Sequence, residues 1–366
     1  MTDLAETEPA PALPRGLNIM LTLAGTVVIV AGLRAFSDSV GPIFLALVVV
    51  VAVSPVQAAV RRRGAPSWLA MLVLMAVSYG VILIIVGALV WATAELVGLV
   101  GGDTYATELQ AARDSVAGYV EELGVTGDDL DGVLDIVDVK TLAGQLVSAL
   151  SGVLGLLSTL ALILFAMIFI VMDAEKLGRN LKYVANERPT VAAGLNKFAS
   201  STRSYFAVSS IFGLIVAVFD TVALLILGVP LALVWGVLAF ITNYIPNVGF
   251  VIGLIPPAMI AFFEGGWQLS LTVIVIYSVL NVVIQSIIQP KFVGDAVGLS
   301  ATLTFVSLIF WGWVLGPLGA LLAVPMTLLA KALLIDIDPT TTWASPLIAL
   351  DDPHLSVERD QPDAVE

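Results

Sequence analysis

The segment LALVWGVLAFITNYIPNVGFVIGLIPPAMIAFF, residues 231–263, is apolar enough to enter a membrane but is interrupted by proline and glycine. Proline has no N–H to donate and its ring clashes with the preceding helical turn, so Pro246 predicts a break. In hydrocarbon, the backbone groups freed by a break are tolerated only where they are buried in protein or line a wet cavity. The residues expected to interrupt the helix are Pro246, Gly249, Gly253, Pro256 and Pro257.

A second interrupted segment occupies residues 302–332 and contains WGWVLGPLGALLAVP at 311–325. Two such segments in corresponding positions of two half-repeats are typical of a transporter's binding site. The halves here are 205–263 and 267–332, each a straight helix followed by a broken one. The interrupting residues of the second half are Gly316, Pro317, Gly319 and Pro325.

The sequence leaves two courses open for the broken segments. If both fold back as hairpins, the two halves have opposite orientations, and if both cross the membrane as proline-kinked helices, the halves are parallel. Hairpins are favoured because they place Lys291 on the cytoplasmic side, where lysine and arginine accumulate.

The composition excludes a soluble globular enzyme. Hydrophobic residues make up 59% of the 366 residues and charged residues 12%, with a mean hydropathy of +1.02. Soluble domains are about 45–50% apolar and about 25% charged. Cysteine is absent, the only histidine is His354, and no phosphate-binding G-x-x-x-x-G-K-[ST] loop occurs. We therefore expect no catalytic residues, no metal site, no cofactor and no nucleic-acid partner.

Eight apolar runs are long enough to enter a bilayer, which a helix of about 20 residues spans. This pattern predicts an all-α membrane protein with about eight membrane segments, two of them broken or re-entrant, and an extracytoplasmic helical insertion. The runs fall at about 17–35, 40–60, 67–99, 150–172, 205–228, 231–263, 267–289 and 302–332.

Lysine and arginine in short loops predict the orientation, because they accumulate on the cytoplasmic side. Arg61, Arg62 and Arg63 follow the second run, and six basic residues lie within 173–204, so both loops and both chain ends are expected inside. The expected parts are an acidic cytoplasmic leader (1–16), three spans (17–99), an extracytoplasmic helical insertion (100–149), a fourth span (150–172), a cytoplasmic basic amphipathic helix (173–204), a transport core with broken helices (205–332) and an acidic cytoplasmic tail (333–366).

The negative net charge of −13 comes mostly from two acidic pieces outside the membrane. Residues 101–148 contain ten acids and two bases, and residues 336–366 contain eight acids and one base. Within the first piece, residues 104–123 carry a narrow apolar stripe at helical spacing. The stripe predicts packing either on the same segment of another subunit, which favours an oligomer, or against residues 130–146.

Asp220 is the charged residue that lies well inside an apolar run, 205–228. An isolated carboxylate at that depth costs at least about 2.5 kcal/mol, so it must face protein or water, take up a proton or bind a cation. Asp220 is therefore a candidate ion or proton site. The alternative is an interfacial carboxyl near the outer end of the helix.

Polar side chains recur at every fourth residue of run 267–289 and share one helical face. Amides on such a face suit a neutral hydroxylated solute or a partly dehydrated ion, although hydrogen bonding between helices is an equal alternative. Two further amides flank Pro246. The candidate substrate or ion pathway is Asp220, Asn243, Asn247, Tyr277, Asn281, Gln285 and Gln289.

Four phrases in this order resemble the autoinducer-2 exporter family of bacterial and archaeal membrane proteins. They are SPVQAAVRRRG (54–64), NYIPNVGFVIGLIPP (243–257), QPKFVGDAVGLS (289–300) and WGWVLGPLGALLAVP (311–325). The sequence departs from the family pattern at Ala207 and Val208, about where Gly and Gln are expected, and at Ser300 and Ala301, where a Pro is usual.

The resemblance implies eight membrane segments, an extracytoplasmic helical insertion before the fourth and a basic inner helix before the fifth. It also implies a homo-oligomer, a pentamer in particular, in the prokaryotic plasma (inner) membrane, with both termini cytoplasmic. Members of the family transport small hydrophilic molecules, the quorum-sensing signal autoinducer-2 among them, and some relatives are assigned sodium/proton antiport.

The leading functional hypothesis is a membrane transporter that moves a small hydrophilic solute, exporting a signalling or metabolic molecule of the autoinducer-2 type. The alternative is a sodium/proton antiporter that uses Asp220. An intramembrane enzyme is disfavoured because no nucleophile–base pair is visible. A passive scaffold is disfavoured because packing alone does not require clustered polar and broken segments.

Overall fold

The computed structural model describes residues 14–100, 156–246, 248–289, 299–338 and 341, and its regular structure is entirely helical in those ranges. This confirms the all-α fold class. The expected insertion and its stripe at 104–123, most of the leader, and the tail beyond 341 lie outside the described residues.

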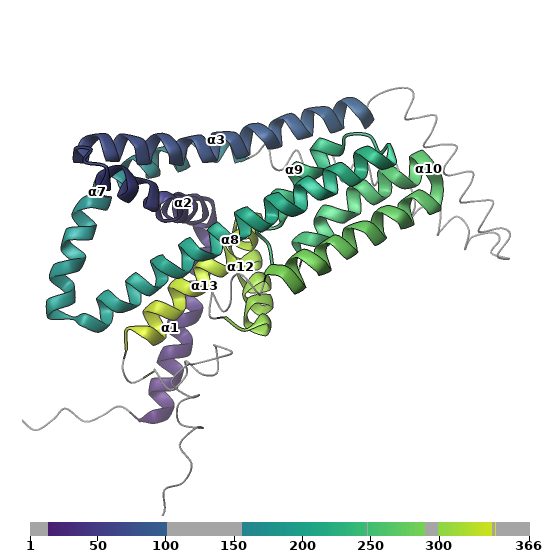
Figure 1. Cartoon of the computed structure of the whole chain (residues 1–366). Helices are drawn as coiled ribbons and strands as arrows, with labels where there is room; N and C mark the ends of the chain where they lie inside the picture. Colours follow the sequence, from purple (N-terminus) through teal and green to yellow (C-terminus); the bar gives the residue numbers. More distant parts are fainter. Residues whose placement is uncertain (1–13, 101–155, 247, 290–298, 339–340, 342–366) are drawn as a thin grey trace, which may run out of the picture.

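The helices follow one another along the chain as long rods and shorter pieces (Figure 1). They are α1 (Arg15–Ala35), α2 (Ser37–Arg62), α3 (Ser67–Val100), α7 (Leu156–Glu187), α8 (Pro189–Leu227), α9 (Ala232–Thr242), α10 (Gly249–Asn281), the π-helix η1 (Val282–Ile288), α12 (Ala301–Leu321), α13 (Ala323–Lys331) and the π-helix η2 (Ala332–Asp336).

Five described helices are long and apolar enough to cross a membrane, so the protein is a multi-pass membrane protein. They are Ser37–Arg62, Ser67–Ala92, Pro189–Leu227, Gly249–Ile288 and Ala301–Leu321. Three further apolar helices, Ile19–Ala35, Thr159–Ala174 and Ala232–Thr242, are shorter than a full span. The expected number of about eight segments is therefore not confirmed by full-length spans among the described residues.

Large apolar side chains cover the outside of the helices. Ile226 is 79% exposed and Ile84 is 72% exposed, on helices α8 and α3. Such a surface is unfavourable in water and suits contact with lipid chains. The outer surface thus supports the expected lipid bilayer partner.

The predicted basic helix at 173–204 is wrong as a single element. Helix α7 runs on to Glu187, Arg188 has a non-helical backbone, and α8 begins at Pro189. Proline is well placed at the first position of a helix, where no N–H is needed, and cannot continue a preceding one. The basic residues therefore lie at the end of α7, at the bend between the two helices and at the beginning of α8.

Among the described residues, three large clusters of buried apolar side chains join the helices. One surrounds Trp235 where α3, α8, α9 and α10 meet, a second surrounds Leu322 between α2, α8, α12 and α13, and a third surrounds Leu74 between α2, α3 and α7. Helix α8 enters the first two clusters through Leu224 and Phe198. In lipid, close packing rather than the hydrophobic effect holds such helices together, so α8 is the shared scaffold.

The first predicted break is confirmed, but its second part is wrong. Helix α9 ends at Thr242 and α10 begins at Gly249, with Pro246 between them. Pro256 and Pro257, expected to interrupt the chain again, are buried inside α10. Neighbouring helices can satisfy the backbone groups that an intramembrane proline frees.

The chain instead turns at Gly265 and Gly266, which are non-helical within α10. Gly266 has φ +68°, a left-handed conformation that glycine adopts without steric cost. The prolines therefore stay in a helix while Gly265 and Gly266 supply the turn.

The second broken segment bends at Gly316, which also has φ +68°, and Pro317 follows directly. This confirms the predicted break. Pro325 makes no separate break, because it is the third residue of α13, where a missing N–H costs no intrahelical bond. A Cβ on Gly319 would collide with the Trp311 carbonyl, so the two arms of α12 pack closely together.

Both broken segments thus fold back on themselves. A Cβ on Gly253 of α10 would lie 3.5 Å from the Ala239 Cα of α9, and one on Gly312 would lie 3.8 Å from the Ala320 Cβ across the bend in α12. Gly253 and Gly319, predicted as helix breakers, therefore act as contact points between paired arms.

Candidate functional site

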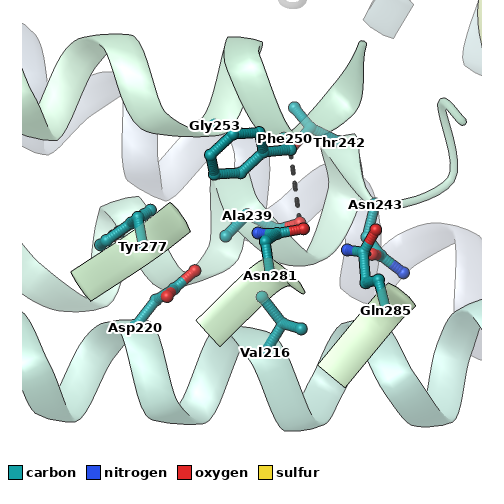
Figure 2. A pocket seen from close by; sticks show the side chains of 10 residues that line it. All are labelled: Val216, Asp220, Ala239, Thr242, Asn243, Phe250, Gly253, Tyr277, Asn281 and Gln285. Atoms are coloured by element: carbon teal, nitrogen blue, oxygen red, sulfur yellow. Dashed lines mark hydrogen bonds between the residues drawn. The ribbon is translucent and has the colours of Figure 1, made fainter. Parts of the chain in front are cut away.

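A small pocket lies where α8, α9 and α10 meet (Figure 2). Its volume is about 10 Å³, room for about one water molecule. The pocket is lined by Val216, Asp220, Ala239, Thr242, Asn243, Phe250, Gly253, Tyr277, Asn281 and Gln285.

Five of the seven predicted pathway residues line this pocket: Asp220, Asn243, Tyr277, Asn281 and Gln285. Gln289 is half-buried but does not line the pocket, and Asn247 lies outside the described residues. Residues from segments far apart in the sequence therefore meet at one place.

Asp220 and Tyr277 occupy one end of the pocket, as Figure 2 shows. Each side chain is 1% exposed, and the two Asp220 oxygens and the Tyr277 hydroxyl have no hydrogen-bond partner. Buried polar groups in native structures are normally paired. Their unpaired state at a pocket indicates that a ligand or water completes this end.

Asn243 and Gln285 close the other end of the pocket (Figure 2). The Gln285 Nε2 donates to the Asn243 Oδ1 at 2.6 Å, and the Asn243 Nδ2 donates to the Ser209 carbonyl at 2.9 Å. This chain of bonds joins η1, the break after α9, and α8. The amide end is therefore satisfied, whereas the carboxyl end is not.

Gly213 makes the approach of Asn243 to α8 possible. A Cβ at Gly213 would lie 2.6 Å from the Asn243 Nδ2 and 3.2 Å from the Asn243 Cβ. Only a glycine at this place in α8 leaves room for the amide. The same logic applies at Gly236 of α9, where a Cβ would overlap the Thr221 hydroxyl of α8.

A second set of hydrogen bonds holds the break against α8. The Tyr205 hydroxyl donates to the Tyr244 carbonyl at 2.6 Å, and the Ser210 and Tyr244 hydroxyls are 2.7 Å apart. These bonds anchor the residue that follows Asn243. The backbone freed near Pro246 is thus partly paired by side chains of α8.

Sequence reasoning missed Tyr205, Ser209, Ser210 and Tyr244 as supports of the site. A signal for two of them was present, since Tyr205 and Ser209 recur with Gly213 and Asp220 at spacings of four, four and seven. Such spacings place them on one face of a helix. Only a search for polar residues on that face would have found them.

The π-helix η1 could not be predicted from the stripe of polar residues. Spacing of four keeps residues on one side of an α-helix, but Gln285 lies inside a π-helix that follows α10. The wider turn still leaves Gln285 on the pocket beside Asn281. Single π-helical turns occur frequently at functional sites.

The pocket offers hydrogen-bonding groups rather than reactive ones. Its polar lining comprises a carboxyl, a phenol, a hydroxyl and three amides, and it contains no lysine, arginine or histidine. Among the described residues, no group of three or more histidine, cysteine, aspartate or glutamate side chains could hold a metal ion. These groups can form hydrogen bonds with a small polar molecule.

Comparison with known proteins decides the family. The family model described as "AI-2E family transporter" matches residues 23–338. The chain belongs to the AI-2E transporter family. The resemblance found in the four sequence phrases is thereby confirmed, and the protein is a membrane transporter.

Relatives of the AI-2E family protein match along most of their length. The AI-2 transport protein TqsA of Escherichia coli (strain K12) is 30% identical over 319 residues, 86% of this chain and 91% of TqsA. The YhhT protein of the same strain is 28% identical over 316 residues, 86% of this chain and 90% of YhhT. Neither match supports the sodium/proton antiporter alternative. The family that the chain belongs to is a family of transporters and not of enzymes.

Proposed function

We propose that this AI-2E family transporter exports a small, neutral, hydroxylated solute of the autoinducer-2 type across the prokaryotic plasma (inner) membrane. The observation that carries the proposal is the pocket itself, where Asp220 and Tyr277 present unpaired polar atoms at one end and Asn243 of the helix break lines the other. The printed name of TqsA, an AI-2 transport protein, supports this solute class.

The lining of the pocket favours a neutral solute with several hydroxyl groups. Asn281, Thr242 and Tyr277 can each donate and accept hydrogen bonds, while Asp220 adds acceptor oxygens. A hydroxylated solute leaves water at low cost only if each of its polar groups finds a partner. A negatively charged solute would lack a cationic partner among the pocket residues.

The pocket as it stands is closed. Room for about one water molecule is too little for such a solute, and the bond between Gln285 and Asn243 seals one end. Because the lining comes from α8, α9, α10 and η1, these helices must separate for loading and release. The breaks at 243–248, Gly265–Gly266 and Gly316 are the places where the backbone can bend.

The folded-back segments 232–263 and 301–321 support a re-entrant arrangement, in which each hairpin enters and leaves on one side. The two halves of the core are then inverted repeats around the pocket, with both chain ends cytoplasmic. A homo-oligomer, a pentamer in particular, is part of the proposal and rests on the family resemblance. Native mass spectrometry of the solubilised protein tests it, and a monomer would contradict it.

Transport in vesicles tests the proposed function. Proteoliposomes with the full chain should equilibrate labelled autoinducer-2 faster than empty vesicles, and Asn281→Leu should abolish the difference because it removes a polar group from the pocket. Ser78→Ala is the matched control, since Ser78 is also buried and unpaired but lies on α3 away from the pocket. Equal flux in protein-containing and empty vesicles for autoinducer-2 and for other small polyols would refute the proposal.

A further inference from the structure

Asp220 lacks the partner that its burial demands. It is the only buried acidic side chain among the described residues, and both of its oxygens are without a hydrogen bond. The buried Lys331, by contrast, lies 3.2 Å from the Asp336 carboxylate. A charged group is tolerated inside the membrane part of a protein when it is paired or reaches water, and such groups mark proton and substrate pathways.

The elements around Asp220 supply one other titratable group. Helices α9 and α10 line the pocket with it, and only Tyr277 of α10 is ionisable there. Helix α3 contributes the apolar Ala92 to the same cluster, while its Glu95 is exposed. Glu264, at the turn in α10, is exposed as well.

The remaining charged groups that face α8 lie elsewhere along it. The Asp336 carboxylate of η2 lies 3.6 Å from Lys197 and 3.2 Å from Lys331. Lys197 precedes Asp220 on α8 by more than five helical turns. Arg203, also on α8, reaches Ser54 of α2 at 3.4 Å. None of these groups lines the pocket, so no cation of the described residues neutralises the carboxylate there.

The charge of Asp220 must therefore depend on what fills the pocket. No hydrogen bond from the described residues reaches the Asp220 oxygens, and a buried carboxylate without donors is less favourable than the neutral, protonated acid. When hydroxyl groups of a solute point at the same oxygens, they donate charge-assisted hydrogen bonds, which are stronger to the ionised form. Filling the pocket thus favours release of the proton.

We infer that Asp220 couples solute movement to an opposite movement of one proton, because its buried, unpartnered carboxyl and the Tyr277 hydroxyl face the pocket that binds the solute. This inference rests on the proposed function. It differs from sodium/proton antiport because the solute itself, and not a metal cation, exchanges with the proton at Asp220.

The exchange is balanced at each step. When the solute enters from one side, the O–H bond of Asp220 breaks and its proton passes to water on that side. When the solute leaves on the opposite side, the carboxylate takes a proton from water there and the empty pocket closes. For export, protons move inward, so an inward proton gradient drives the solute out. Tyr277 is a positioning residue, whose hydroxyl can donate to the ionised carboxylate.

The decisive experiment uses the full-length wild-type protein in proteoliposomes with a pH-sensitive dye inside. An autoinducer-2 gradient should move protons against the direction of the solute, and an imposed pH gradient should drive autoinducer-2 to accumulate on the more acidic side. Downhill solute flux with no proton movement and no pH-driven accumulation would overturn the inference while the proposed function stands. No solute flux at all would overturn both.

Variants assign the coupling to Asp220. In Asp220→Asn, the ratio of protons to solute moved should fall to zero, and any remaining solute flux should lose its pH dependence. In Ser78→Ala the ratio should equal that of the wild type. An Asp220→Asn protein that still moves protons with solute would overturn the assignment. Tyr277→Phe should shift the pH dependence of solute flux while protons still move, a change that a purely structural role would not produce.

Discussion

At the scale of single residues, the site depends on glycines that give polar groups room. Gly213 and Gly236 let α8 approach Asn243 and α9 without a clash. Such contacts are close enough that one added methyl group must displace its neighbour. Small residues at helix contacts are the usual means by which membrane helices approach one another.

Gly213→Ala should lower both transport and the unfolding temperature. The new methyl group would lie 2.6 Å from the Asn243 Nδ2 and would push the amide away from the Ser209 carbonyl. Gly87→Ala on α3 is the control, because a Cβ there meets nothing within 4 Å and alanine favours a helix over glycine by about 1 kcal/mol. Equal transport by the two variants would contradict the role given to Gly213.

Tyr205→Phe should lower the free energy of unfolding by about 1–3 kcal/mol, because it leaves a buried carbonyl unpaired. The lost bond is the 2.6 Å contact from the Tyr205 hydroxyl to the Tyr244 carbonyl. Thermal unfolding in detergent measures the change. Tyr183→Phe, at a tyrosine that is 69% exposed on α7, should leave the transition where it is.

At the scale of elements, the pocket is held between a long continuous helix and two broken ones. Helix α8 runs uninterrupted from Pro189 to Leu227, whereas α9 and α10 are separated by a break. A continuous helix can act as a fixed support while hairpins joined by short breaks move against it. Discontinuous helices at a binding site serve this purpose in other transporters.

A disulfide between α8 and α9 should stop transport. The Thr221 Cβ lies 3.3 Å from the Cβ position of Gly236, close to the range of about 3.5–4.5 Å found between the Cβ atoms of a disulfide. The chain has no cysteine of its own, so Thr221→Cys with Gly236→Cys forms a single defined crosslink. Oxidation should block autoinducer-2 flux in vesicles, and a reductant should restore it.

The double variant under reductant is the reference for that crosslink, and the Thr221→Cys single variant under the same oxidant shows whether the oxidant alone affects transport. Full transport by the oxidised double variant would show that α8 and α9 need not separate. The pocket would then have to open by movement of α10 alone.

At the scale of the whole molecule, a group of charges joins the beginning of α8 to α13 and η2. Asp336 of η2 lies 3.2 Å from Lys331 and 3.6 Å from Lys197 of α8. Lys331 is 8% exposed, so its pair with Asp336 is largely shielded from water, whereas the Lys197 side chain is 58% exposed. Two helices distant in sequence are fixed together by it.

Asp336→Asn should destabilise the protein by about 3–5 kcal/mol, the usual cost of removing one partner from a buried ion pair. Lys331 would be left buried beside a second lysine. The matched control is Asp173→Asn, whose pair with Lys176 is about 70% exposed and should contribute only about 0–1 kcal/mol. Thermal unfolding of both variants in detergent compares them. Equal effects would contradict the stabilising role given to the buried pair of Lys331 and Asp336.

The folding stability of the protein should also rise with pH because of Lys331. Burial lowers the pKa of Lys331 from its ordinary 10.5, although Asp336 acts in the opposite direction. Between the lowered pKa and 10.5, the folded protein binds fewer protons at Lys331 than the unfolded chain, so stability increases with pH. The unfolding temperature of Lys331→Met should lack this rise relative to the wild type, and an identical pH profile would contradict it.

The sequence by itself determined the helical membrane class, the breaks at Pro246 and Gly316, and most of the polar residues that line the pocket. These follow from hydropathy and from the geometry of proline and glycine, which act within a few neighbouring residues. Only the tertiary structure decided that the chain turns at Gly265–Gly266 and that Asp220 lies unpaired beside Tyr277. Those features depend on which helices pack together, and a linear pattern carries no record of contacts between distant segments.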